Sequence, residues 1–257
     1  MEIAEHIDAL RRQGGWLADA AERAGLDATV PPCAPWQVKD LLRHTGYVHR
    51  WAARHVTECL DQILDGPPEE EILRGGTDDA GLLAWFRDGH AALVQTLATA
   101  DPAVECATFI AAPSPLAFWA RRQAHETAIH RADAESAAGA TPEYEPGFAA
   151  DGIDELITGF GRRRKYQPGS TADGTRLRML AADTGDAWLV EGYEGRLQPR
   201  RDRDPGNDAA GCTVTGPASG LYLYLWNRAD AARVGVTVTG DPGLLSAWQA
   251  SVRVRWG

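Results

Sequence analysis

Lysine is nearly missing from this chain, and positive charge is the minority charge. Only Lys39 and Lys165 are lysines among the 26 basic residues, whereas 36 residues are acidic, so the formal net charge is −10. An excess of negative charge repels the phosphate backbone and opposes nonspecific binding to nucleic acid. We therefore expect small molecules, and not nucleic acid, as partners.

Cysteine is also scarce, and its spacing lacks the pairs that disulfide frameworks and zinc knuckles require. The four cysteines (Cys33, Cys59, Cys106 and Cys212) are scattered along the chain with no Cys-x-x-Cys pair. A disulfide-rich scaffold and a cysteine zinc site both depend on closely spaced cysteines. The four side chains are therefore interpreted as buried free thiols.

The chain lacks the apolar runs that membrane insertion needs. No stretch reaches the roughly 18 uninterrupted apolar residues of a membrane span. Near the start, Glu2 and Glu5 occupy positions where a signal peptide has a basic flank followed by an apolar run. We expect a cytoplasmic protein without a membrane partner.

Histidine is absent from the second half of the chain, since all seven histidines lie within the first 130 residues. At 257 residues, the chain exceeds the usual domain of about 100–150 residues, and its composition (44% apolar, 24% charged) is that of a globular protein. Two domains are predicted, at residues 1–142 and 147–257. Histidine chemistry must then belong to the first.

Apolar residues at helical spacing predict four helices in the first domain. The fourth has the clearest bounds, because Ser114 can cap it, Pro115 suits the first helical position and Gly139 can close it. The predicted helices span residues 2–24, 36–64, 79–100 and 115–138. Four helices joined by loops predict a bundle.

The second domain mixes short strand-like runs, separated by Gly and Asp turns, with apolar helical stretches. Strands are predicted at residues 177–183, 187–193, 195–201, 212–216 and 234–241. Helices are predicted at residues 148–164, 217–230 and 242–252. The expected class is α+β, with a helical bundle followed by a smaller α+β domain of mainly antiparallel strands.

The fourth predicted helix contains the run HETAIH, which is one residue too long for the zincin motif His-Glu-x-x-His. His125 and His130 are five residues apart and point about 140° away from each other on a helix. Glu126 and His130 are four residues apart, so both side chains can reach one point between helices. This pair predicts two ligands of a divalent metal.

The second predicted helix supplies the third ligand. His44 lies on the same helix face as apolar neighbours such as Leu41 and Val48. His49 lies on a different face of this helix. His49 and His125 are interpreted as surface residues or as residues that support the ligands. A carboxylate such as Glu126 is costly to bury unless a positive group meets it, which favours a metal. The alternative is that both histidines are core residues hydrogen-bonded to carboxylates. Three protein ligands with an open position are typical of catalytic zinc.

The segments at residues 32–51 (PCAPWQVKDLLRHTGYVHRW), 119–135 (WARRQAHETAIHRADAE) and 216–230 (GPASGLYLYLWNRAD) resemble the maleylpyruvate isomerase-like, mycothiol-dependent enzymes. The resemblance covers nearly the whole chain. It implies a DinB-like bundle followed by a sterol-carrier-like domain, with His44, Glu126 and His130 as the metal ligands. Gln37 stands where relatives commonly carry Ser or Thr as a helix cap, and Asp40 can still favour the first helical turn.

The resemblance also implies an activity. Zinc or another divalent metal would hold mycothiol, the small thiol of actinobacteria, as a thiolate that adds to a small electrophile. In a cis–trans isomerase the adduct rotates and expels the thiol, whereas in an S-transferase of detoxification or biosynthesis the adduct remains. An arginine of the second domain would bind the substrate carboxylates, with Arg228 as the first candidate. The alternative outside enzymes is a metal-binding or ligand-binding regulatory module, and the expected assembly is a monomer or homodimer.

Overall fold

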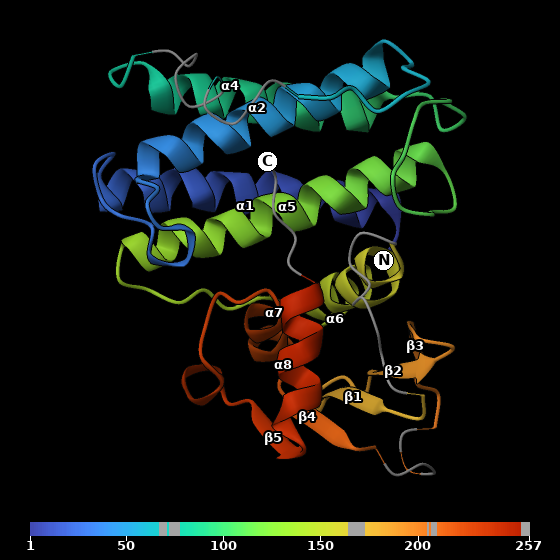
Figure 1. The fold of residues 1–257 in the computed structure, drawn as a ribbon. Helices are drawn as coiled ribbons and strands as arrows, with labels where there is room; N and C mark the ends of the chain where they lie inside the picture. Colours follow the sequence, from blue (N-terminus) through green and yellow to red (C-terminus); the bar gives the residue numbers. More distant parts are fainter. Residues whose placement is uncertain (67–70, 72–77, 164–172, 205, 207–209, 253–257) are drawn as a thin grey trace. The chain divides into compact units, whose positions relative to one another are not determined.

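A computed structural model describes residues 1–66, 71, 78–163, 173–204, 206 and 210–252. The chain divides into two compact units between Pro142 and Glu143. The first unit is helical, and the second combines helices with a five-stranded sheet (Figure 1). The predicted α+β class is confirmed. Among the described residues, no helix combines the length and apolar character that crossing a membrane requires.

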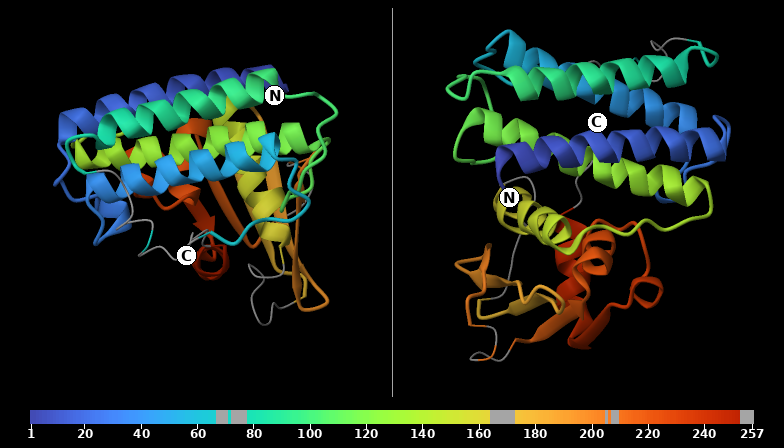
Figure 2. Two further views of the ribbon diagram at one scale, coloured as in Figure 1. Left: turned by 90° about the horizontal axis from the view of Figure 1, so that it is seen from above. Right: turned by 180° about the vertical axis from the view of Figure 1, so that it is seen from behind.

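Four long helices form the first unit. They are α1 (Ile3–Ala24), α2 (Val38–Thr57), α4 (Leu82–Thr99) and α5 (Pro115–Ala137), with a 3₁₀ turn, η1 (Pro31–Cys33), before α2. Figure 2 shows the four helices side by side, with α1 packed on α5 and α2 packed on α4. Their apolar faces meet in a core that includes Leu17, Leu41, Leu42, Leu82 and Phe86.

The second helix ends earlier than the sequence predicts. Residues 36–64 carry a helical pattern, but α2 stops at Thr57 and Cys59 takes a left-handed conformation with φ of 50°. The chain then folds back, so that the Trp51 indole donates to the carbonyl of Leu64 at 3.1 Å. The Leu64 N–H in turn donates to His55 Nε2 at 3.1 Å. These side-chain contacts replace the backbone bonds that a longer helix would have made.

The second unit is built on a sheet with strand order β3-β2-β1-β4-β5, in which only the β1–β4 pair is parallel. Its strands are β1 (Arg176–Ala181), β2 (Ala187–Tyr193), β3 (Arg196–Arg201), β4 (Cys212–Gly216) and β5 (Thr237–Gly240). Its helices are α6 (Pro146–Asp154), α7 (Ala218–Leu225) and α8 (Pro242–Ser251). The Trp188 indole donates to Asp154 at 3.0 Å and links β2 to the end of α6.

Several predicted bounds in the second unit are corrected. The helix predicted for residues 148–164 is α6 followed by a π turn (Glu155–Gly159) and a 3₁₀ turn (Phe160–Arg162), and residue 164 lies outside the described residues. The helix predicted for residues 217–230 ends at Leu225, because Asn227 is left-handed with φ of 59°. The strand predicted for residues 234–241 is shorter, since a 3₁₀ turn (Ala231–Val234) occupies its start.

The cysteines are free, as predicted, but they are not uniformly buried. Cys212 on β4 is buried, whereas Cys33 and Cys106 are partly exposed and Cys59 is exposed. Cys59 becomes exposed because the chain turns out of α2 at this residue. The prediction of buried thiols is therefore correct only for Cys212.

Candidate metal centre in the helical bundle

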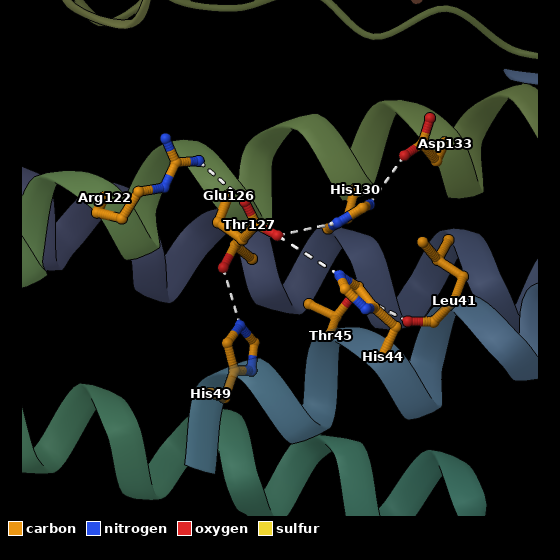
Figure 3. A network of polar contacts seen from close by, with 9 residues as sticks. All are labelled: Leu41, His44, Thr45, His49, Arg122, Glu126, Thr127, His130 and Asp133. Atoms are coloured by element: carbon orange, nitrogen blue, oxygen red, sulfur yellow. Dashed lines mark hydrogen bonds and ion pairs between the residues drawn. The ribbon is translucent and has the colours of Figure 1, made fainter. Parts of the chain in front are cut away.

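Three side chains converge in the interior of the bundle. His44 comes from α2, and Glu126 and His130 come from α5, one helical turn apart (Figure 3). Glu126 Oε1 lies 3.6 Å from His44 Nε2 and 3.1 Å from His130 Nε2. One donor atom from each residue lies within 4.8 Å of the other two, and all three residues are buried.

The local sequence explains how α2 presents His44. Gln37 is the N-cap residue, and its backbone N–H donates to the Asp40 carboxylate at 2.9 Å, so Asp40 supports the first turn without a Ser or Thr cap. His44 follows the buried Leu41 by three residues and therefore shares its inward face. The centres of the Trp36 and His44 rings lie 5.0 Å apart, and the two ring planes are tilted by 53°.

Asp133 fixes the orientation of His130. Its Oδ2 atom lies 2.9 Å from His130 Nδ1, and Asp133 is completely buried. A carboxylate only accepts hydrogen bonds, so Nδ1 is the donor and Nε2 faces Glu126 and His44. Burial lowers the pKa of the ring, but the hydrogen bonds to Asp133 and Glu126 outweigh burial and raise the pKa of His130 to about 9. Nε2 lies 3.1 Å from Glu126 Oε1, which also only accepts, so a hydrogen bond between these two atoms requires a second proton on the ring.

Glu126 is held from its other side by Arg122. The guanidinium NH2 of Arg122 donates to Glu126 Oε2 at 3.0 Å, and both side chains are almost completely buried. Burial of Glu126 raises its pKa, yet hydrogen bonds from His130 and His44 and the positive charges of His130 and Arg122 hold that pKa well below its usual value. Glu126 is therefore ionised at neutral pH.

The three donors suit a zinc-like divalent ion. Imidazole nitrogens and a carboxylate oxygen are zinc ligands, and two ligands at about 2.0–2.1 Å in a tetrahedral arrangement are about 3.4 Å apart. The observed separations from Glu126 Oε1 to the two histidines, 3.6 Å and 3.1 Å, lie on either side of that value. The Asp133–His130 pair also matches the carboxylate support that metal-bound histidines receive. The residues present thus fit the ion.

The other histidines of α2 and α5 lie outside this cluster. The His125 ring packs edge-on against His6 of α1, with the ring centres 6.1 Å apart. His49 Nε2 lies 2.9 Å from the hydroxyl of Thr127, and burial, followed by the charge of His90, lowers its pKa well below the usual value. Both His49 and His125 are completely buried, so the interpretation of either as a surface residue is wrong.

Arg228, the predicted substrate-binding arginine, belongs to the second unit and follows α7. Its side chain is partly exposed, and NH1 donates to the carbonyl of Trp226 at 2.8 Å. This bond fixes one edge of the guanidinium close to the end of the helix. A guanidinium carries five N–H donors in a planar fork that matches the two oxygens of a carboxylate.

Two residues of the site were missed by the sequence reasoning. Arg122 precedes Glu126 by four residues, and Asp133 follows His130 by three. Both spacings place the side chains on the same helix face, and opposite charges at these spacings are a recognised helix pattern. The signal in the sequence is a charged residue one helical turn from each ligand on α5.

The fold and the cluster define a class: a helical bundle with a buried two-histidine, one-carboxylate centre, joined in one chain to an α+β domain. Residues 7–135 match the mycothiol maleylpyruvate isomerase N-terminal domain, and residues 147–247 match the C-terminal domain of the same enzymes. The chain therefore belongs to the mycothiol-dependent maleylpyruvate isomerase family. The predicted family is confirmed.

Solved structures agree with this assignment at the level of the fold. The chain is similar to the crystal structure of the mycothiol-dependent maleylpyruvate isomerase, with a TM-score of 0.64, 15% identity and 93% of each chain covered. A histidine-to-alanine mutant of that isomerase matches equally well, with the same TM-score, identity and coverage. No curated protein sequence matches the chain.

Proposed function

We propose that the protein is a zinc-dependent or other divalent metal-dependent enzyme that uses mycothiol to isomerise a small cis-unsaturated acid of the maleylpyruvate type. The observation that carries the proposal is the convergence of His44, Glu126 and His130 in the bundle interior. Membership of the family supports mycothiol as the thiol and isomerisation as the reaction. Three protein donors are the number that catalytic zinc sites use, with a further position left for water or thiol.

The residues of the bundle have distinct tasks in this proposal. His44 and His130 hold the ion through nitrogen, Glu126 holds it through Oε1, and Asp133 keeps His130 in the tautomer with Nε2 free to bind. A bound divalent ion lowers the pKa of a coordinated thiol, so that the nucleophilic thiolate is present at neutral pH. Residues 1–142 are proposed as the metal-binding domain.

The second domain, residues 147–257, is proposed to help bind substrate. It contains no histidine, and Arg228 is the proposed residue that binds a substrate carboxylate. A guanidinium presents paired N–H donors that match the two oxygens of a carboxylate. The proposed enzyme acts in the cytoplasm on small molecules, as a monomer or homodimer.

The reaction follows from the thiol chemistry of the family. The mycothiol sulfur adds to one carbon of the cis double bond, and the other carbon takes up a proton or delocalises the charge into its carbonyl. The resulting single bond rotates, any proton taken up by the other carbon is released again, and expulsion of the thiolate restores the double bond in the trans form. Mycothiol is regenerated in this isomerase reaction. In an S-transferase, the same addition ends with the sulfur attached to the product.

Mass spectrometry of the product mixture tests the proposal. Zinc-loaded protein is incubated with mycothiol and maleylpyruvate, and the trans isomer and any mycothiol adduct are quantified separately. We expect the trans isomer to form in a mycothiol-dependent reaction and to be lost in a His44→Ala variant. A stable adduct in place of the isomer would assign an S-transferase. Metal binding without turnover of maleylpyruvate or of a panel of other electrophiles would assign a binding module.

A further inference from the structure

Arg122 is a fully buried cation in direct contact with a proposed metal ligand. Its side chain is 1% exposed and that of Glu126 is 3% exposed, and the two lie one turn apart on α5. Removing a guanidinium from water costs several kcal/mol unless a charged partner and good hydrogen bonds compensate. A cation beside a site that receives another cation also opposes metal binding by repulsion. The burial of Arg122 beside the proposed metal ligand Glu126 therefore needs a functional explanation.

The geometry shows that the two oxygens of Glu126 have different partners. Oε2 accepts the hydrogen bond from Arg122 at 3.0 Å, whereas Oε1 lies 3.1 Å from His130 and 3.6 Å from His44 (Figure 3). Hydrogen bonds between a guanidinium and a carboxylate are charge-assisted and strong. Arg122 therefore occupies the oxygen that points away from the histidines and leaves Oε1 to face them.

We propose that Arg122 is a positioning residue that restricts Glu126 to a one-oxygen ligand and thereby makes the site selective for zinc-like ions over calcium. This inference rests on the proposed metal site. Two nitrogens and one oxygen provide three ligands, which suits a four-coordinate ion with one open position. Calcium takes six to eight oxygen ligands, often including two from one carboxylate. A carboxylate that Arg122 holds through Oε2 cannot supply both of its oxygens to calcium.

A purely structural Arg122 would behave differently. If the ion pair only stabilised the bundle, replacing Arg122 would lower the free energy of unfolding and leave the coordination of a bound ion unchanged. If Arg122 positions Glu126, its loss frees Oε2 to approach the ion as a second oxygen ligand. Coordination number and metal preference therefore separate the two roles.

Cobalt substitution measures the coordination directly. The full-length protein is loaded with Co²⁺, and its visible absorption is recorded for wild type, Arg122→Gln and Arg122→Lys. We expect an intense four-coordinate spectrum for wild type and a weaker five-coordinate spectrum for Arg122→Gln. Arg122→Lys keeps the positive charge and can donate to Glu126 from its single nitrogen, so it should restore much of the wild-type spectrum. Arg50→Gln is the matched control, because Arg50 is a bundle arginine that bonds to backbone carbonyls of Gly46 and Trp85.

Metal affinity provides a second readout. Chelator competition with both ions should show the preference for zinc over calcium reduced by about 10-fold or more in Arg122→Gln, because the freed Oε2 gives calcium a second oxygen ligand. Unchanged spectrum and selectivity in a folded Arg122→Gln protein would overturn the inference and leave the proposed function intact. Failure of wild type to bind Co²⁺ or Zn²⁺ would instead remove the proposed metal site. If Arg122→Gln does not fold, a crystal structure of the zinc-loaded wild type decides, since Glu126 binding through both oxygens would contradict the inference.

Discussion

Asp133 Oδ2 and His130 Nδ1 lie 2.9 Å apart on consecutive turns of α5, in the interior of the bundle. The contact leaves Nε2 as the only ring nitrogen of His130 that faces Glu126. Asp133 therefore controls which nitrogen is offered to a metal without lying in the ligand set. Such supporting carboxylates increase the basicity of the ring as well as fixing its orientation.

Asp133→Asn should weaken zinc binding while the protein remains folded. Asparagine has almost the same shape, but its amide can donate as well as accept and carries no charge, so the His130 tautomer is no longer fixed. We expect a loss of zinc affinity of about 10–100-fold, measured by competition with a chromophoric chelator. Glu135→Gln is the control, since Glu135 pairs with Arg23 and Arg131. Equal affinity in wild type and Asp133→Asn would assign Asp133 a packing role alone.

His130→Ala should abolish stoichiometric metal binding, whereas His125→Ala should retain most of it. The two histidines are five residues apart on α5, and His125 packs against His6 instead of facing Glu126. Elemental analysis of both purified variants gives the metal content per chain. Equal loss in both proteins would show that the ligands are misassigned.

Helical spacing predicts that Glu126 and His130 share one face of α5 and that His44 lies on the inward stripe of α2, and the three side chains lie close together in the bundle. The spacing of apolar residues along the chain does not predict side-chain contacts that form only when the chain folds back on itself. The helical pattern continues past Thr57 and predicts a longer helix, whereas α2 ends there and Trp51 and His55 bond to Leu64 in the returning chain. Such contacts are visible only once the chain is folded.

The charged partners of the proposed ligands can be predicted from the sequence, but only after the ligands themselves have been identified. Arg122 and Asp133 look like surface residues in a helix rich in Arg, Asp and Glu, because charged residues are seldom buried. Their burial becomes understandable only beside Glu126 and His130, whose opposite charge and hydrogen bonds compensate the loss of water. The positions of Glu126 and His130 therefore indicate that Arg122 and Asp133 are buried, whereas the composition of the helix does not.

Two Arg–Glu pairs with the same helical spacing should differ sharply in their contribution to stability. Arg122–Glu126 on α5 is buried, whereas Arg54–Glu58 at the end of α2 is about half exposed. Glu126→Ala removes the carboxylate paired with a buried guanidinium, and this should cost about 3–5 kcal/mol in free energy of unfolding. Glu58→Ala should have little effect, because water screens the exposed pair. Urea denaturation of the metal-free proteins measures both, and similar losses would mean that Arg122 reaches water or another partner.

Metal-free stability should fall as the pH rises from about 6.5 to 9. The folded-state pKa of His130 is raised from 6.5 to about 9, so its contribution is fully present below pH 6.5 and is lost as the pH approaches 9. The contribution is about 3 kcal/mol at most. Urea denaturation in the presence of a chelator measures it, with His130→Ala as the reference that should lack this component. A parallel pH dependence in both proteins would show that His130 does not carry the bridging proton.

Zinc binding should show the opposite trend over the same interval. The ion replaces the proton on His130 Nε2, so apparent affinity rises with pH up to about 9 and about one proton is released per zinc bound at neutral pH. Calorimetry in buffers of different ionisation enthalpy counts the protons released. Binding at pH 7 without proton release would mean that His130 is already neutral in the metal-free protein.

Arg228→Lys should separate substrate binding from metal binding. Lysine keeps the positive charge but lacks the planar fork that matches a carboxylate. Metal content should be unchanged because all three proposed ligands belong to the bundle. Turnover of an acidic substrate should fall by about 10-fold or more, the loss expected when an oriented pair worth about 1.4 kcal/mol disappears from the transition state. Steady-state kinetics with zinc-loaded protein provides the measurement.

The outcome of the Arg228→Lys experiment also decides whether other arginines of the second domain should be tested as the carboxylate-binding residue. Unchanged turnover would eliminate Arg228 and direct attention to Arg233, and to Arg253 and Arg255, which lie outside the described residues. Loss of metal together with turnover would mean that the substitution disturbs the bundle, and the kinetic change would then carry no information on substrate. A selective fall in turnover of acidic substrates, with neutral electrophiles unaffected, is the result that a carboxylate-binding guanidinium requires, because only a charged substrate loses a partner.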